Sequence, residues 1–329
     1  LGDDGTAHAR FGREAALLAD IRHPGVVEYV AHGSYAGAPY LAMEWLDGVD
    51  LAARSRATRI DAFATVEMRP TQPGGEGELA GDDDGGVPAG LPAAEVLVLA
   101  RRLASALGEV HGRGVVHRDL KPENVFLLDA DLTRAKLIDF GVARGAEAAA
   151  LTADGVVIGT PHYMAPEQVR GDVVTAATDV WGLGAVLYEL FAGRPPFTGS
   201  HPLAVMARIV VDEAPPLGEL RADLPAELTE LIHAMLAKEP GQRPRTGRLA
   251  EAFERLGGTL AGALAAAPAP LVAPGALKAQ ITGSEARIRA LLFARRDGGE
   301  AAAGLLDELR AAAASRGGEF ERVGAGERS

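Results

Sequence analysis

The sequence predicts an α+β protein in which a short part containing strands precedes a longer, mainly helical part. A helical pattern over 8–21 is followed by strand-like runs at 26–32 and 40–43. After a long polar stretch, apolar residues recur at helical spacing, first over 93–111. Strands gathered in one part of a chain and helices in another are typical of α+β folds.

Composition narrows the class of protein. The chain has 329 residues, 47% of them hydrophobic, which is enough for one large domain or two smaller ones. It has no cysteine, which excludes disulfides and Cys-ligated zinc, and no signal peptide opens it. The net charge of −12 argues against a nucleic-acid surface. We therefore expect a cytoplasmic protein that acts on proteins or peptides.

The first helix is amphipathic. Four apolar residues fall on one of its faces: Phe11, Ala15, Leu18 and Ile21. Glu14 lies among them, and by helix pattern alone it would be a solvated carboxylate. The segment 33–37 between the two strand-like runs reads as a hairpin turn rather than a phosphate cradle, since no helix begins after it.

Residues 55–92 differ in composition from the segments around them. They contain Pro70-Thr71-Gln72-Pro73-Gly74-Gly75 and a run of three aspartates at 82–84. We predict a flexible acidic insertion, in which the aspartates are a solvated charge run rather than a metal site.

The most specific pattern of the chain lies at 117–124, which reads His-Arg-Asp-Leu-Lys-Pro-Glu-Asn, with Asp139-Phe140-Gly141 a short distance beyond. Asp119 can accept a proton from a hydroxyl nucleophile, and Lys121 can neutralise a transferring phosphoryl group. Asn124 and Asp139 offer the hard oxygen ligands that Mg²⁺ prefers. Alone, Asp119 would be a turn residue or a helix cap. The combination predicts phosphoryl transfer.

These residues resemble the catalytic loop and magnesium motif of the bacterial eukaryotic-type (Hanks-type) Ser/Thr protein kinases. The resemblance extends from about Phe11 to Leu256 and includes Thr178-Asp179-Val180-Trp181-Gly182-Leu183-Gly184. It implies a kinase domain over 1–257 with a bilobal protein-kinase-like fold, an incomplete β small lobe and a complete, mainly α-helical large lobe. ATP and Mg²⁺ are the implied cofactors, with Mn²⁺ as an alternative metal, and protein Ser/Thr hydroxyls are the implied acceptors.

The resemblance also implies a nucleotide site. Glu14 takes the place of the glutamate on the family's αC helix, and Met43 takes the gatekeeper position. Glu44 and Leu46 belong to the hinge that binds adenine through its backbone. Phe126 matches the residue beneath adenine, although ordinary core packing explains it equally well.

The segment 139–167 resembles an activation segment. Arg118 matches the arginine that pairs with a phosphorylated threonine of that segment, and Thr152 stands at such a position, unless it is simply a polar loop residue. Thr160 matches the threonine that hydrogen-bonds the catalytic aspartate and lysine.

Four residues match structural positions of the family. His117 resembles a buried histidine of the kinase core, Asp179 an aspartate that hydrogen-bonds the catalytic loop, and Glu167 and Arg243 the two members of an ion pair. The other seven histidines we interpret as surface or packing residues.

Two features of the family are missing from these residues. There is no G-x-G-x-x-G pattern, and the first lysine of the chain is Lys121. We therefore expect an N-terminally incomplete kinase copy that is nearly inactive as it stands. One alternative is a pseudokinase or scaffold that binds partners without catalysis, and a weaker one is the sensor half of a multidomain signalling protein.

Beyond the kinase-like part, 258–284 is rich in Ala, Pro and Gly, and we predict a linker there rather than a membrane helix. Residues 285–329 predict a partial β-α-β segment that faintly resembles the start of a class III nucleotide cyclase domain. Arg295 stands where such a cyclase carries a metal-binding aspartate. No oligomeric state follows from these patterns.

Overall fold

The computed structural model describes six parts of the chain: residue 12 and residues 15–35, 38–56, 90–140, 161–266 and 290–292. The chain divides into two compact units. The smaller unit comprises 1–21, 27–46 and 268–329, and the larger unit comprises 22–26 and 47–267.

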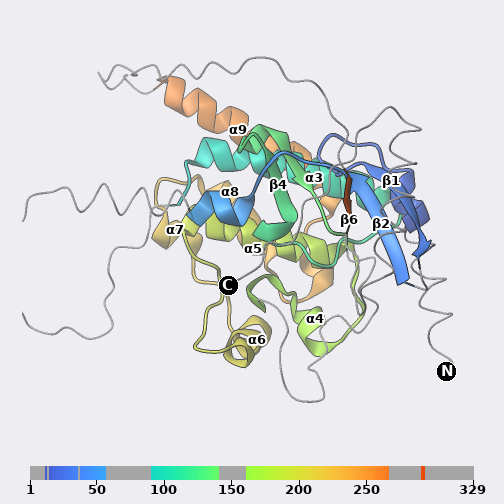
Figure 1. The fold of residues 1–329 in the computed structure, drawn as a ribbon. Helices are drawn as coiled ribbons and strands as arrows, with labels where there is room; N and C mark the ends of the chain where they lie inside the picture. The colour runs from blue at the N-terminus through green and yellow to red at the C-terminus, as the bar shows by residue number, and fades with distance from the viewer. Residues whose placement is uncertain are drawn as a thin grey trace, which may run out of the picture. The chain divides into compact units, whose positions relative to one another are not determined.

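In the smaller unit, residues 15–19 are helical, and Ala15, Leu18 and Ile21 are buried as the amphipathic pattern predicts. Strand β1 (Tyr29–Tyr35) pairs antiparallel with β2 (Ala38–Glu44). The other edge of β2 pairs with β6 (Ala290–Leu292), so that Met43 lies opposite Leu291 (Figure 1).

The first strand begins and ends later than the sequence predicts. Val26 belongs to the larger unit, where it forms a bridge with Leu137 instead of continuing β1. At its other end, β1 continues to Tyr35, through residues that we had expected to form the hairpin turn.

The sheet of the larger unit has the order β3 (Gly48–Asp50), β4 (Val125–Leu128), β5 (Ala135–Leu137) and is antiparallel throughout. Gly48 has a φ of 150°, and a Cβ atom there would lie 2.0 Å from the Leu127 carbonyl oxygen. Only glycine fits this close approach of two strands.

Three long helices form the body of the larger unit: α3 (Ala93–Gly112), α5 (Ala176–Ala192) and α9 (Thr246–Ala266). Helix α3 packs against both α9 and α5. Helix α5 is apolar on nearly every side and is buried along most of its length, including Trp181, Tyr188 and Phe191. Figure 1 shows the smaller helices α4 (Pro166–Arg170) and α6 (Pro202–Val211) on the far side of α5 from α3.

The other helical segments described in the larger unit are short. They are residues 51–56, α7 (Leu217–Leu220), α8 (Ala226–Met235) and the 3₁₀ turns η1 (Pro122–Asn124), η2 (Leu132–Arg134), η3 (Pro161–Tyr163) and η4 (Pro240–Gln242).

Helix α9 runs further than expected, through Ala266, and so enters the stretch 258–284 that we predicted to be a linker. Alanine and leucine dominate this extension, and the first proline after it is Pro268. Of the helices in the described parts of the chain, none has the length and apolarity needed to cross a membrane. Nearly all of the predicted insertion, 57–89, lies outside the described residues.

Candidate active site

The loop 115–121 connects α3 with the 3₁₀ turn η1, and a buried carboxylate holds its backbone. Asp179, 1% exposed on α5, accepts hydrogen bonds from the backbone N–H of His117 (2.7 Å) and of Arg118 (2.8 Å). Arg118 has a φ of 70°, a left-handed conformation that is unfavourable for a side chain of this size. The two hydrogen bonds compensate for this strain and fix the loop next to the sheet.

His117 ties the loop to the segment that leads to Asp139. Its buried ring donates from Nε2 to the carbonyl oxygen of Ile138 (2.9 Å), and its Nδ1 accepts from the backbone N–H of Asp119 (3.4 Å). Burial lowers the pKa of His117 and outweighs Asp179, which raises it. The ring is therefore neutral and lies 4.8 Å from that of Phe140.

Three side chains of the predicted catalytic set converge. Lys121 Nζ lies 3.0 Å from Asp119 Oδ2. Asn124, 4% exposed, donates from Nδ2 to the backbone oxygen of Asp119 (2.7 Å) and to its Oδ2 (3.1 Å). The Asp119 carboxylate is thus oriented from two sides and remains partly exposed, as a group that accepts a proton from a substrate must be.

The chain brings Asp139 towards this set through a backbone contact, since Ile138 N–H donates to the Asn124 carbonyl oxygen (3.0 Å). Asp139 has a φ of 56°, which turns the chain immediately after β5. Because the Asn124 amide nitrogen is bound to Asp119, its side-chain oxygen faces away from that residue. Asn124 and Asp139 therefore offer oxygen donors that suit Mg²⁺.

No three His, Asp or Glu side chains gather in the described parts of the chain to form a closed metal site. An ion held by Asn124 and Asp139 would draw its other ligands from water and from nucleotide phosphates, which is the arrangement that Mg²⁺ favours.

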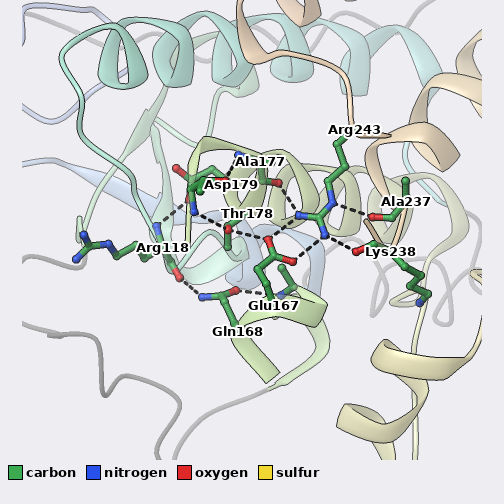
Figure 2. A network of polar contacts seen from close by, with 11 residues as sticks. Arg118, Glu167, Gln168, Ala177, Thr178, Asp179, Ala237, Lys238 and Arg243 are labelled. Atoms are coloured by element: carbon green, nitrogen blue, oxygen red, sulfur yellow. Dashed lines mark hydrogen bonds and ion pairs between the residues drawn. The ribbon is translucent and has the colours of Figure 1, made fainter. Parts of the chain in front are cut away.

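Beside the loop lies a buried ion pair, shown in Figure 2. Arg243 donates from Nη1 to Glu167 Oε1 (2.7 Å) and from Nη2 to Glu167 Oε2 (2.8 Å). Its other N–H groups donate to the carbonyl oxygens of Ala177, Ala237 and Lys238. Burial raises the pKa of Glu167, but hydrogen bonds from Arg243 and Thr178 outweigh it and leave the pKa below its ordinary value.

Two residues of this network were missed in the sequence. His111 is the first, because its Nε2 contacts Asp179 Oδ2 (2.7 Å) and its Nδ1 contacts Thr246 Oγ1 (2.9 Å). Its interpretation as a surface or packing residue was incomplete, since its ring bridges two helices by hydrogen bonds. Gln168 is the second, and it donates from Nε2 to the Arg118 carbonyl oxygen (2.7 Å), which joins α4 to the catalytic loop. Neither lies in a motif that would have singled it out.

The other predicted site residues belong to one of the two units or fall outside the described residues. In the smaller unit, Met43 and Glu44 end β2, and Leu46 follows them. Phe126 lies on β4 of the larger unit, half-buried and opposite Asp50 and Lys136. Four residues are outside the described part of the chain: Glu14, Gly141, Thr152 and Thr160.

Comparison with curated proteins finds bacterial kinases. The chain is 36% identical over 242 residues to the DNA damage-responsive serine/threonine-protein kinase RqkA of Deinococcus radiodurans, a match covering 73% of this chain and 32% of that protein. It is 34% identical over 252 residues to the serine/threonine-protein kinase PknB of Mycobacterium tuberculosis, covering 75% and 35%. The chain thus spans about a third of the length of these relatives.

A solved structure shares the fold. A point mutant of the kinase domain of Mycobacterium tuberculosis PknI superposes with a TM-score of 0.52 at 28% identity, over 76% of this chain and 78% of that one. This similarity confirms the predicted α+β, protein-kinase-like fold. The family model described as "Protein kinase domain" matches residues 2–253, which is most of the chain. The chain belongs to the protein kinase family.

Proposed function

We propose that this chain is the catalytic domain of a Ser/Thr protein kinase, which transfers the γ-phosphoryl group of ATP to Ser and Thr hydroxyls of proteins. The observation that carries the proposal is the orientation of Asp119 by Lys121 and Asn124 on a loop held by Asp179. The Ser/Thr kinases among its relatives support the same acceptor. The net charge of −12 and the absence of cysteine support protein partners in the cytoplasm.

Each residue has a chemical role in this proposal. Asp119 accepts the proton of the attacking hydroxyl, and Lys121 offsets negative charge on the oxygens being transferred. Asn124 and Asp139 would hold Mg²⁺, and bound Mg-ATP would supply the phosphoryl group. Arg118, Thr152 and Thr160 remain proposed regulatory residues. Glu14, Met43, Glu44, Leu46 and Phe126 remain proposed contacts of the nucleotide site.

The 329 residues contain neither a glycine-rich phosphate loop nor a lysine before Lys121. Loss of one well-placed electrostatic group typically lowers a rate by about 10²–10³-fold. Residues 1–329 alone should therefore transfer phosphate slowly, and addition of the two features should restore the rate.

The test compares this chain with the same chain extended at its N-terminus by a glycine-rich G-x-G-x-x-G loop and a strand that carries a lysine. Both are incubated with radiolabelled Mg-ATP and casein, and the labelled amino acids are separated. We expect phosphoserine and phosphothreonine, formed at least about 100-fold faster by the extended chain.

The Asp119→Asn variant of the extended chain should lose this activity, whereas Glu227→Gln, at an exposed ion pair, should keep it. Radiolabelled phosphate on the tyrosines of casein would refute the proposal. Equal rates of phosphate transfer by Asp119→Asn and its parent would also refute it. If the extended chain transferred no phosphate but bound a protein partner, the result would instead favour the alternative function, a pseudokinase or scaffold without catalysis.

A further inference from the structure

A strand from outside the part of the chain that the family model matches is added to the small sheet. The match ends at residue 253, whereas β6 comprises Ala290–Leu292. Strand β6 pairs antiparallel with the last three residues of β2 and gives the sheet the order β1-β2-β6 (Figure 1). Both strands belong to the smaller unit. The paired residues of β2 include Met43 and Glu44, which the proposed function assigns to nucleotide binding.

The backbone of Met43 faces β6. Glu44 N–H donates to the carbonyl oxygen of Glu28 (2.9 Å), so the backbone groups of Glu44 point to the β1 side of β2. The N–H and C=O groups of successive residues in a strand point to opposite edges, and those of Met43 therefore point away from β1. Leu291 lies opposite Met43 on β6. Met43 and Leu291 are thus the pair whose N–H and C=O groups face each other.

Strand β1 holds this end of β2 incompletely. The register of the two strands shifts between Tyr29, which lies opposite Met43, and Ala31, which lies opposite Ala42. Such a shift leaves a residue unpaired and disrupts the ladder locally. A sheet of only two strands is at best marginally stable in water, and a third strand stabilises it. Strand β6 therefore supplies pairing at the end of β2 where β1 supplies least.

From this arrangement we propose that β6 is a positioning strand of the nucleotide site. Its pairing with β2 holds the backbone of Met43 and Glu44 in the extended form that binds Mg-ATP, and bound Mg-ATP in turn holds β6 on the sheet. The inference rests on the proposed function, which places nucleotide contacts at Met43, Glu44 and Leu46. Coupling between two binding events is reciprocal, so nucleotide and strand strengthen each other's binding by the same factor.

This coupling makes the C-terminal segment a control element of the site. A strand of three residues is held by few hydrogen bonds, so it opens more readily than the helices of the larger unit. Release of β6 lowers the affinity for nucleotide, and nucleotide binding draws β6 back onto β2.

The first experiment measures, by calorimetry, the binding of Mg-AMP-PNP, a non-hydrolysable analogue of Mg-ATP, to residues 1–329. Leu291→Pro removes the N–H that faces Met43, and we expect binding at least about 5-fold weaker than that of the parent. Ala290→Pro is the matched control, because the N–H of Ala290 points away from β2 and proline is tolerated as the first residue of a strand. Leu291→Val keeps the N–H of residue 291. Both Ala290→Pro and Leu291→Val should bind Mg-AMP-PNP as the parent does.

The second experiment uses the parent chain alone and needs no variant. Leu291 is not a proposed nucleotide contact, yet saturating Mg-AMP-PNP should slow hydrogen exchange of its N–H by at least about 5-fold, because the coupling is reciprocal. A strand that only covers the edge of the sheet would exchange this N–H at the same rate with and without nucleotide.

The outcomes separate this inference from the proposed function. Equal affinity of the parent and Leu291→Pro, or exchange of the Leu291 N–H that nucleotide leaves unchanged, overturns the inference and leaves the proposed function standing. An equal loss of affinity in Ala290→Pro also overturns it, because the loss would then not come from the pairing with Met43. A parent chain that binds no Mg-AMP-PNP contradicts both the inference and the proposed function.

Discussion

Glu167 and Arg243 are 76 residues apart in the chain and form two parallel hydrogen bonds, of 2.7 and 2.8 Å, in the interior of the larger unit. The Arg243 side chain is fully buried, and that of Glu167 is 3% exposed. Three backbone carbonyl oxygens accept the remaining N–H groups of Arg243, so its charge is compensated by several partners at once.

Glu167→Gln should lower the free energy of unfolding by about 3–5 kcal/mol, because it leaves the guanidinium of Arg243 buried without an opposite charge. Urea unfolding of the variant and its parent measures the difference. Glu227→Gln is the matched control, since Glu227 and Arg255 form an exposed pair at 3.6 Å, and it should cost less than about 1 kcal/mol. Similar costs for both variants would show that burial adds nothing to the pair.

Asp179→Asn should release the catalytic loop. An amide group cannot accept hydrogen bonds at both ends, so at least one of the N–H groups of His117 and Arg118 loses its partner, at a cost of about 1–3 kcal/mol. Hydrogen exchange resolved at single amides should show faster exchange of at least one of these two N–H groups, by about 10-fold or more.

Asp223→Asn is the control, because the Asp223 side chain pairs with Arg221 at the surface. It should leave the exchange of the His117 and Arg118 amides unchanged. Unaltered exchange in Asp179→Asn itself would mean that other contacts hold the loop.

Contact among the side chains of the loop could be predicted, because the proposed chemistry requires specific residue types at fixed spacing. Asp119, Lys121 and Asn124 lie within six consecutive residues, and the structure places their side chains in contact. His111 could not be found in this way. Its partners, Asp179 and Thr246, are 68 and 135 residues away, and nothing in the helical pattern of 93–111 indicates them.

The ends of elements and the pairing of strands were predicted less well. The segment 285–329 was expected to begin with a strand, but a strand pattern does not identify its partner, and the structure pairs β6 with β2. The Ala- and Gly-rich composition after Leu256 favoured a linker, yet α9 continues to Ala266. Packing of α9 against α3 outweighs the weak local preference of its glycines.

Gly90 is required immediately ahead of α3, where the backbone passes close to the end of α5. A Cβ atom at this position would lie 1.9 Å from the Phe191 carbonyl oxygen, and Leu91 N–H already donates to Leu190 (2.7 Å). Gly90→Ala should therefore displace this backbone and destabilise the fold by about 1–3 kcal/mol.

Gly108→Ala is the opposite case, because Gly108 lies within α3 with open space around it. It should stabilise the fold by up to about 1 kcal/mol, and thermal unfolding of both variants and their parent measures the two effects. If both Gly90→Ala and Gly108→Ala destabilised the fold, the cost at Gly90 could not be assigned to a clash with the Phe191 carbonyl oxygen.

Lys238 should give the fold a stability that rises with pH. The unfolded lysine keeps its proton up to a pKa near 10.4, whereas burial lowers the pKa in the folded protein to about 8. Between these values the unfolded state binds more protons, so the free energy of unfolding increases with pH. Below about pH 8 the lysine is charged in both states, and the full cost of burying the ammonium remains.

The measurement compares the parent with Lys238→Met by urea unfolding at half-unit steps from pH 7 to 9.5. The stability of the parent relative to the variant should be constant near pH 7 and should rise above about pH 8, because only the parent can lose the buried charge. Lys238→Arg should show no such rise, since an arginine stays charged over this range. Lys238 Nζ lies over the rings of Trp181 (5.0 Å to the centroid) and Phe197 (4.2 Å). A difference that stays flat, or falls, would mean that these rings hold the ammonium strongly enough to cancel the effect of burial.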